Sequence, residues 1–499
     1  MRAVDHFMVH FAKSTDPDYG NLPIVVDLDG TLTLSDTLAE SIIQLVRANP
    51  VNVFRLPFWL TTGRAACKNA VASHAALAVE RLPYRKPLLA YLAQEKERGR
   101  KILLATAAHK TIAERVAKHL GLFDEVLATD CDTNLKGEVK LQKVRASVGD
   151  QFVYAGDSRA DLPIWSACQH AVLAGVSQRL ARVVRRKAVV EREFRSESAR
   201  LTVWLKALRV HQWLKNLLLF VPMLTAFSFA DTHKLVVLAI AFVSMSLGAS
   251  ATYIGNDLWD IDNDRLHPRK RNRPFASGAL SIHSGIVGAA GLLLVSLALA
   301  LATSVGFAAM LLLYLALTTL YSLLLKAHVV VDVLTLSLLY TLRIVAGAVA
   351  VHIPVSHWLL AFSVFTFLNL ALVKRCSELV ALRENGLVTT AGRDYRVQDL
   401  EILWPLGTGA AMAAVVVFGL FISSPETAAR YAVPELLWFV AVGLVYLFTR
   451  LWVMTARAQM HDDPLIHLIE DRSCQLTILV MLITVMAAHF LPYTIALLQ

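Results

Sequence analysis

The sequence predicts two domains of different class, a soluble α/β domain followed by an all-α integral membrane domain of nine transmembrane helices. The distribution of charge is the first observation behind this division. Residues 1–200 contain 29 Lys+Arg and 22 Asp+Glu, whereas residues 201–499 contain only 20 and 17. The second observation is a series of long apolar runs in the C-terminal part. With 56% hydrophobic residues arranged in this way, the chain is neither disordered nor a purely soluble enzyme.

Residues 22–178 carry the α/β prediction, because apolar runs of strand length alternate there with helical patterns. Strands are expected at 22–28, 101–107 and 151–155, with a helix near 111–120. This alternation is typical of a parallel sheet covered by helices. The long stretch 35–100 has a mostly helical pattern, and we interpret it as a cap inserted after the first strand. The soluble domain is therefore expected to occupy residues 1–178.

The first domain is expected to stay in the cytoplasm. Residues 1–20 include three aspartates and no apolar stretch of signal-peptide length. The five cysteines are scattered without a C-x-x-C pair, which fits a reducing compartment and indicates neither a zinc site nor a disulfide framework. Residues 179–209 form a basic linker with a helical pattern. Either this helix has a solvated charged face, or it lies on anionic lipid headgroups.

Residues 210–499 are expected to form the membrane domain. The nine apolar segments of spanning or near-spanning length are 213–227, 235–254, 285–301, 307–325, 329–350, 356–373, 404–421, 436–454 and 476–498. The connections 255–284, 374–403 and 455–475 are rich in Arg and Lys, whereas the opposite connections carry little beyond Lys234 and Arg430. The positive-inside rule then places the charged loops in the cytoplasm. We expect a multi-pass protein of the cell inner membrane, whose basic excess serves orientation and anionic lipid and no nucleic acid.

A pair of carboxylates follows the first predicted strand. Residues 27–31 read D-L-D-G-T directly after the apolar run 24–26. Two aspartates two residues apart at a strand end project into one crevice, where an α/β sheet usually binds its ligand. Phosphoryl transfer needs this arrangement, because one carboxylate attacks phosphorus and the other handles the leaving-group proton. Further polar residues follow in order: Thr106 after the second strand, then Lys136, Lys140 and Lys143, then G-D-S-R-A-D at 156–161.

These four motifs, in this order, resemble the haloacid dehalogenase superfamily of phosphatases, and the match covers about residues 20–175. The resemblance implies a Rossmann-like haloacid dehalogenase fold with a helical cap. It also implies that Asp27 is the nucleophile and Asp29 the general acid/base. Thr106 would bind the phosphoryl oxygens and Lys140 would neutralise them, with Lys143 as the second choice of lysine. By the same resemblance, Mg²⁺ would be held by the aspartates of the first and last motifs: Asp27, Asp157 and Asp161.

A second acidic motif follows the second apolar segment of the membrane domain. It reads N-D-L-W-D-I-D-N-D over residues 256–264, and on a helix positions 257, 260 and 264 share one face. Like charges stacked beside a bilayer destabilise a helix unless a cation lies among them. Mg²⁺ with a diphosphate is the natural occupant. The basic run 267–274 follows at once.

This motif, followed by R-P and a glycine, resembles the UbiA-type intramembrane prenyltransferase superfamily, over about residues 205–498. The resemblance implies that four residues bind Mg²⁺ and a diphosphate at the mouth of a helical bundle: Asn256, Asp257, Asp260 and Asp264. Members with aromatic acceptors carry a second aspartate-rich motif after the sixth span. Here that place is basic, with K-R-C-S-E at 374–378 and R-D-Y at 393–395.

Basic and polar residues in and near the spans point to a second anion besides the diphosphate. The candidates for substrate binding are Lys215, Asn216, Arg271, Arg273, Tyr321, Lys326, Arg343, Lys374, Arg375, Arg393 and Tyr395. This pattern looks like the decaprenyl-phosphate phosphoribosyltransferase branch of the superfamily, in which phosphoribosyl pyrophosphate reacts with a polyprenyl phosphate. For the lysines and for Arg343 and Arg375, helix-end snorkelling or a topological role remains the alternative.

The sequence thus predicts a bifunctional, Mg²⁺-dependent membrane enzyme. Its membrane domain transfers 5-phosphoribosyl to a polyprenyl phosphate, and its phosphatase removes the 5-phosphate of the product. One alternative is an aromatic-acceptor prenyltransferase of quinone or haem type with an unrelated phosphatase. The other is a transporter or lipid-binding protein with a regulatory cytoplasmic domain, which two intact acidic motifs disfavour. The polyprenyl chain length, a homo-oligomeric state and the phosphatase substrate are left open.

Overall fold

The computed structural model describes residues 21–61, 63–75, 77–130, 133–195, 201–386, 393–460 and 464–491. The expectation for residues 1–20 lies outside this part of the chain. The described chain divides into two compact units. The first runs to Ala207 and also includes Ile254–Val287, and the second comprises Leu208–Tyr253 and the chain from Gly288 onward.

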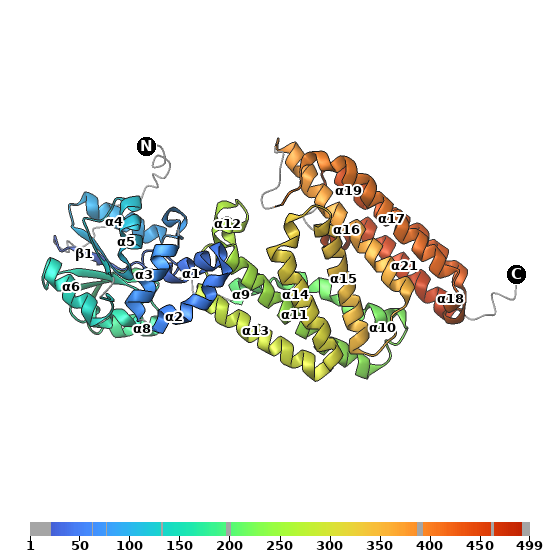
Figure 1. Ribbon diagram of the computed structural model, residues 1–499, viewed down its shortest axis with the longest axis horizontal. Helices are drawn as coiled ribbons and strands as arrows, with labels where there is room; N and C mark the ends of the chain where they lie inside the picture. Colours follow the sequence, from blue (N-terminus) through green and yellow to red (C-terminus); the bar gives the residue numbers. More distant parts are fainter. Residues whose placement is uncertain are drawn as a thin grey trace. The chain divides into compact units, whose positions relative to one another are not determined.

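The first unit is built on a six-stranded parallel sheet with the order β3-β2-β1-β4-β5-β6 (Figure 1). Its strands are β1 Ile24–Val26, β2 Ile102–His109, β3 Glu125–Thr129, β4 Val153–Gly156, β5 His170–Ala174 and β6 Val189–Phe194. Ile24 pairs with Ile102 on one side and with Val153 on the other. The strand order reverses between β1 and β4, and in open α/β sheets ligands bind at the carboxyl ends of such a pair.

Alternating side chains of β1 enter two separate cores, one on each face of the sheet. Ile24 and Val26 pack in one cluster with residues of α4 Lys86–Glu97 and α5 Lys110–Leu120. Val25 packs in the other cluster, with α6 Glu138–Val148, α7 Leu162–Trp165 and α8 Gln178–Val184. Both faces of a parallel sheet are buried in this way, which explains why its strands read as continuous apolar runs.

The stretch between β1 and β2 is helical, as expected. It contains α1 Thr37–Ala48, η1 Pro50–Phe54, α2 Arg55–Thr61, α3 Arg64–His74 and η2 Val79–Arg81 before α4. Asp36 begins α1 by accepting a hydrogen bond from the backbone N–H of Ala39 at 2.9 Å. Leu45, Cys67 and Val71 form a small core within this cap. Helix α4 packs on the sheet, so the cap proper ends before it.

The stretch 179–209, expected to be a helical linker, differs from the expectation. Its ends are helical, in α8 and in α9 Leu201–Leu208, but its middle is β6, the edge strand that pairs with β5. The sequence V-V-E-R-E-F of β6 contains two adjacent β-branched residues, which favours a strand. The arginines on either side of it concealed this short strand in the sequence.

Eight described helices are long and apolar enough to cross a membrane, one fewer than expected. They contain α11 Thr232–Trp259, α13 Ile282–Thr303, α14 Val305–Leu323, α15 Val331–Ala350, α16 His357–Glu384, α17 Leu400–Ile422, α19 Leu437–Ala456 and α21 Arg472–Phe490. The expected span 213–227 instead folds as the 3-10 stretch η4 Val210–Phe220 and the short helix α10 Val221–Thr225. Pro222, which lacks a backbone N–H, lies in the first turn of α10. Proline is tolerated in the first turn of a helix but interrupts a helix that would continue through it.

Shorter elements connect these helices. They are α12 Ile261–Leu266, η5 Lys270–Asn272, η6 Leu325–Ala327, η7 Val397–Asp399, α18 Pro425–Arg430, η8 Pro434–Leu436 and α20 Pro464–Glu470. The fold class is therefore confirmed as a parallel α/β domain followed by a helical membrane domain.

Candidate active sites

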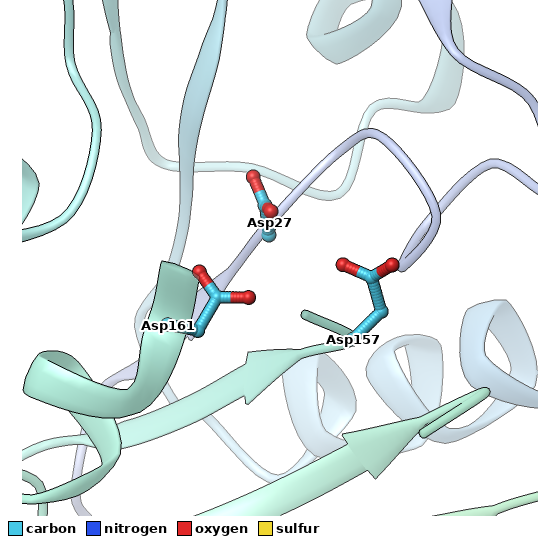
Figure 2. A group of neighbouring side chains, drawn as sticks. All are labelled: Asp27, Asp157 and Asp161. Carbon is cyan, nitrogen blue, oxygen red and sulfur yellow. The ribbon is translucent and has the colours of Figure 1, made fainter. Parts of the chain in front are cut away.

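Three aspartates meet at the carboxyl end of the sheet. Asp27 follows β1, Asp157 follows β4, and Asp161 ends the 3-10 turn η3 Arg159–Asp161. One carboxylate oxygen of each lies within 4.8 Å of the others, and no other such group of three occurs in the described part of the chain. Figure 2 shows the three carboxylates around one common space. Carboxylate oxygens are the ligands that Mg²⁺ prefers, so these residues fit a magnesium ion.

Lys140 of α6 supplies a positive charge to this cluster. Its Nζ lies 2.9 Å from Asp27 Oδ1 and 3.7 Å from Asp161 Oδ1, and its side chain is only 3% exposed. The Tyr154 hydroxyl accepts a hydrogen bond from Lys140 at 3.0 Å and donates one to Asp161 at 2.8 Å. Among the candidate lysines, Lys140 is thus brought to Asp27, whereas Lys143 lies 4.0 Å from Asp130 and is 45% exposed.

Burial and neighbouring charges disfavour the ionised forms of Asp157 and Asp27. Burial, followed by the charges of Asp27 and Asp161, raises the pKa of Asp157 to about 7. Burial also raises the pKa of Asp27, while Lys140 acts in the opposite direction. A divalent cation among these oxygens would offset both burial and repulsion, which is a second reason why the residues fit a metal ion.

Asp29 has a different environment from Asp27, although the two are two residues apart. The backbone N–H of Thr37 donates to Asp29 Oδ1 at 2.8 Å and fixes the carboxyl at the start of α1. Burial and the nearby charge of Asp36 raise the pKa of Asp29 to about 8. A carboxyl with this pKa holds a proton at neutral pH, as a general acid must.

The loop that carries the aspartates depends on Gly30 and Arg85. Gly30 has φ +78°, and a Cβ atom built on it would lie 2.1 Å from Asp157 Oδ2, so only glycine fits there. Arg85 donates to the carbonyls of Thr31 at 3.0 Å and Gly30 at 2.8 Å. Arg85 lies outside the sequence motifs of the site and was not among the predicted residues.

Thr106 is fully buried within β2, and its hydroxyl accepts a hydrogen bond from the Ala108 N–H at 3.0 Å. A cavity of about 640 Å³ opens beside the aspartate cluster. Asp27, Asp29 and Lys140 line this cavity, as do Leu38 and Ile42 of α1 in the cap. Residues of a distant segment also line it: Ser281, Ile282, His283 and Ile286. No sequence motif pointed to these four residues.

The second acidic motif does not form the single continuous helix that we expected. Helix α11 ends at Trp259, and Asp260 (φ −97°) begins α12. Aspartates spaced by three and four repel one another on a helix, and aspartate favours helix starts over helix interiors. Arg273 Nη1 contacts both Asp257 Oδ1, at 3.1 Å, and Asp264 Oδ2, at 2.7 Å. Asn256 stands in the last turn of α11, and Arg271 is exposed in η5.

In the second unit, Arg343 of α15 is buried among polar partners. Its guanidinium donates to Asn216 Oδ1 at 3.0 Å and to the Tyr314 hydroxyl at 2.8 Å. Asn216 in turn donates to the Ser246 hydroxyl at 2.9 Å. Lys215 Nζ lies 5.8 Å from the centre of the Tyr340 ring, over which Arg343 is also placed. The structure thus unites three of the predicted substrate-binding residues: Lys215, Asn216 and Arg343.

Arg375 of α16 forms ion pairs with Asp332 and with Glu378. The Tyr321 hydroxyl donates to Asp332 Oδ1 at 2.7 Å, and Arg393 Nη1 lies 3.1 Å from Glu378 Oε2. Carboxylates therefore balance the positive charge of this second cluster, and the prediction of a basic place did not foresee the pairing with Asp332. Asp332 is a signal that could have been used, because an aspartate inside an apolar span is rarely without a partner or function.

The remaining candidates lie near this cluster or elsewhere on the same helices. The Tyr395 hydroxyl accepts a hydrogen bond from the Val330 N–H at 3.2 Å, and the Arg375 guanidinium lies 5.9 Å from the Tyr395 ring. Lys326 is half-buried in η6, and Lys374 is half-buried in α16. Tyr321, Arg375, Arg393 and Tyr395 are thus brought together around Asp332 and Glu378.

Family models match both parts of the chain. The UbiA prenyltransferase family matches residues 218–467, and the haloacid dehalogenase-like hydrolase family matches residues 24–166. A relative that is similar over most of both chains is the uncharacterized protein y4nM of Sinorhizobium fredii, which is 37% identical over 459 residues, 91% of this chain and 88% of that protein.

Other similar proteins cover mainly the membrane domain. The nodulation protein NoeC of Azorhizobium caulinodans is 38% identical over 276 residues, 55% of this chain and 89% of that protein. The decaprenyl-phosphate phosphoribosyltransferase of Mycobacterium tuberculosis is 35% identical over 221 residues, 43% of this chain and 72% of that protein. Among solved structures, a UbiA homolog from Archaeoglobus fulgidus bound to DMAPP and Mg²⁺ has a TM-score of 0.43 at 17% identity, covering 58% of this chain and 99% of that chain.

Proposed function

The chain belongs to the UbiA prenyltransferase family and carries a haloacid dehalogenase-like hydrolase domain, and on this basis we propose that it is a polyprenyl-phosphate phosphoribosyltransferase that dephosphorylates its own product. The observation that carries the transferase half is the similarity, over the membrane domain, to a protein named for this reaction. The phosphatase half is carried by the contact of Asp27 with Lys140 beside two further aspartates. The proposal assigns the hydrolysis to the α/β domain, whose sheet extends to β6, and the transfer to residues 210–499.

The transfer step is a displacement at the anomeric carbon of phosphoribosyl pyrophosphate. An oxygen of the lipid phosphate forms the new C–O bond, and the bond to pyrophosphate breaks, so pyrophosphate leaves with its electron pair. The acceptor is already an anion, so positioning and charge neutralisation suffice and no strong base is needed. We assign Asn256, Asp257, Asp260 and Asp264 to the Mg²⁺-bound pyrophosphate. Basic residues such as Lys215 and Arg343 are assigned to the phosphates.

The hydrolytic step takes the 5-phosphate of the ribosylated lipid. Asp27 attacks phosphorus, the bond to the ribose 5-oxygen breaks, and Asp29 gives its proton to that oxygen. Asp29 then accepts a proton from the water that hydrolyses the aspartyl-phosphate and releases inorganic phosphate. Lys140 and Thr106 hold the phosphoryl oxygens. Mg²⁺, when bound by Asp27, Asp157 and Asp161, screens the charges of the carboxylates and the phosphate.

The two steps belong together chemically, because removal of the 5-phosphate makes the preceding transfer hard to reverse. Both sites are assigned to the cytoplasmic face of the cell inner membrane, where phosphoribosyl pyrophosphate is available. This assignment follows the positive-inside distribution of the loops.

The test uses the purified full chain in detergent with Mg²⁺, a polyprenyl phosphate and phosphoribosyl pyrophosphate labelled in the ribose. Label is expected in the lipid fraction, and Asp257→Asn should abolish it. Asp27→Asn serves as the matched control, because it removes one aspartate of the other site and should leave the transfer rate within twofold. If no label enters lipid while a prenyl diphosphate is transferred to an aromatic acceptor, the phosphoribosyl proposal is wrong.

A further inference from the structure

The segment that follows the second acidic motif packs, within the first unit, against the cap of the phosphatase. Arg265 of α12 donates from Nη1 and Nη2 to the two carboxylate oxygens of Glu40 on α1, at 2.9 and 2.7 Å. The two side chains are 7% and 1% exposed. Arg265 Nε also donates to the Ala276 carbonyl at 3.0 Å. The guanidinium of Arg265 therefore connects α12 both to α1 of the cap and to the turn that contains Ala276.

Two further contacts extend this docking along the cap. One turn after Glu40, the Gln44 side-chain amide donates to Asp262 Oδ2 at 2.7 Å. On the other side, Gly278 has φ +76°, and a Cβ built on it would lie 2.6 Å from Leu34 Cβ. The backbone of the segment thus approaches the loop before α1 as closely as a glycine permits.

The docked segment reaches the phosphatase cavity. Ser281, Ile282, His283 and Ile286 line the same cavity as the nucleophile Asp27. Ile282 is also the first residue of α13, which has a mean hydropathy of 2.4 and is long enough to cross a membrane. The lining of the cavity therefore includes Asp27 and Lys140 of the first site. It also includes residues 281–283 and 286, and the chain continues from them into a helix of membrane-spanning length.

We infer that residues 281–286 are the substrate-recognition wall of the phosphatase, and that this wall selects a phosphate monoester carried on a membrane lipid. His283 is the recognition residue, because its imidazole is exposed in the wall and can hydrogen-bond the group that bears the phosphate. Arg265 and Glu40 are positioning residues, since they hold the wall without lining the cavity. A site for soluble phosphate esters does not need a lining segment that leads into a membrane helix, whereas a site for a lipid-borne phosphate has to lie next to the membrane. This inference rests on the proposed phosphatase function and adds the residues that recognise its substrate.

The test compares two substrates on the full chain in detergent, p-nitrophenyl phosphate and synthetic farnesyl-phosphoryl-ribose 5-phosphate. The synthetic lipid makes the assay independent of the transferase. His283→Ala should lower kcat/KM for the lipid about tenfold, the effect of one hydrogen bond of about 1.4 kcal/mol, mainly through KM. For p-nitrophenyl phosphate kcat/KM should stay within twofold. Glu40→Gln and Arg265→Met should show the same selective loss, and their double variant no further loss. Glu80→Gln, an exposed glutamate of the cap, is the matched control and should change neither substrate.

An equal loss for both substrates in His283→Ala, or no loss for either, would overturn the inference.

A cross-link gives a readout that does not depend on activity and also covers a Glu40 variant that fails to fold. Cysteines placed at Gln44 and Asp262 should be joined by a short bismaleimide, as detected by peptide mass spectrometry, whereas each single cysteine variant should not. If neither substrate is hydrolysed but the cross-link forms, the proposed function fails and the docking stands. If both are hydrolysed without a cross-link, the recognition wall is wrong and the phosphatase stands.

Discussion

Replacement of the buried Lys140 by methionine is a perturbation whose size can be worked out from the contacts of one atom. Lys140 Nζ lies 2.9 Å from Asp27, 3.7 Å from Asp161 and 3.0 Å from the Tyr154 hydroxyl. Methionine has a similar volume, so little of the effect comes from packing. Removing one partner of a buried ion pair leaves an uncompensated charge and costs about 3–5 kcal/mol. We expect a loss of that size in the stability of the sheet.

The same change should reduce phosphatase activity, because Lys140 is assigned to the phosphoryl oxygens. Loss of one group that stabilises transition-state charge lowers kcat by about 10²–10³-fold. Native-state hydrogen exchange at β1 and β4 measures the stability of the sheet separately from the membrane domain, for which a single unfolding transition is not defined. Hydrolysis of p-nitrophenyl phosphate measures the activity.

Lys143→Met is the matched control. The Lys143 ammonium lies 4.0 Å from Asp130 and the side chain is 45% exposed, and exposed ion pairs contribute about 0–1 kcal/mol. We expect unchanged exchange at β1 and β4 and activity within twofold. The reasoning is refuted if Lys143→Met loses activity while Lys140→Met keeps it, or if Lys140→Met leaves the exchange of β1 unchanged.

Three further predictions concern the same cluster. Tyr154→Phe removes the hydroxyl that bridges Lys140 and Asp161 and should cost about 1–3 kcal/mol by exchange at β4; an unchanged free energy would show that the bridge is not needed. Gly30→Ala should abolish phosphatase activity and leave lipid labelling intact, because its Cβ would meet Asp157 at 2.1 Å; an active variant would contradict the tight contact. Added Mg²⁺ should slow exchange at β1 and β4 in the wild type, and Asp157→Asn should remove most of this effect, whereas an equal effect in both would place the ion elsewhere.

Asp27 and Asp157 of the first site were predictable from the sequence because each follows an apolar strand. The carboxyl ends of β1 and β4 lie next to each other in a parallel sheet, so residues 130 positions apart meet there. The sequence did not reveal the residues outside the motifs that position this cluster. Arg85 and Tyr154 act through carbonyl and hydroxyl contacts, and such contacts depend on the packed fold and leave no spacing pattern.

The membrane domain was predictable as a class and less so in detail. Apolar runs gave the number of spans to within one, but hydropathy does not distinguish a spanning helix from the 3-10 stretch and short helix over 210–225. Helical spacing placed three aspartates on one face, whereas the helix ends at Trp259 and restarts after Asp260. The pairing of Arg375 with Asp332 joins two helices, and only the tertiary structure could reveal it. The roles of these residues in binding substrate stay predictions.

The contacts between α12 and α1 join the second acidic motif to the cap of the first domain. Helix α12, which carries Asp264, also carries Arg265, whose side chain is ion-paired with Glu40 of the cap. A chain in which transferase and phosphatase were independent would not need a buried ion pair at this position, because burying two charges is costly unless the geometry is well matched. This ion pair is compatible with the proposed function, in which the product of one site is the substrate of the other.

The most direct test is mass analysis of the lipid made by the wild type and by Asp27→Asn from labelled phosphoribosyl pyrophosphate and a polyprenyl phosphate. The account predicts a ribosylated lipid without the 5-phosphate from the wild type. From Asp27→Asn it predicts the same lipid with the 5-phosphate retained, in comparable total amount. An identical lipid from both proteins, or a wild-type product that keeps its 5-phosphate in the presence of Mg²⁺, would contradict it.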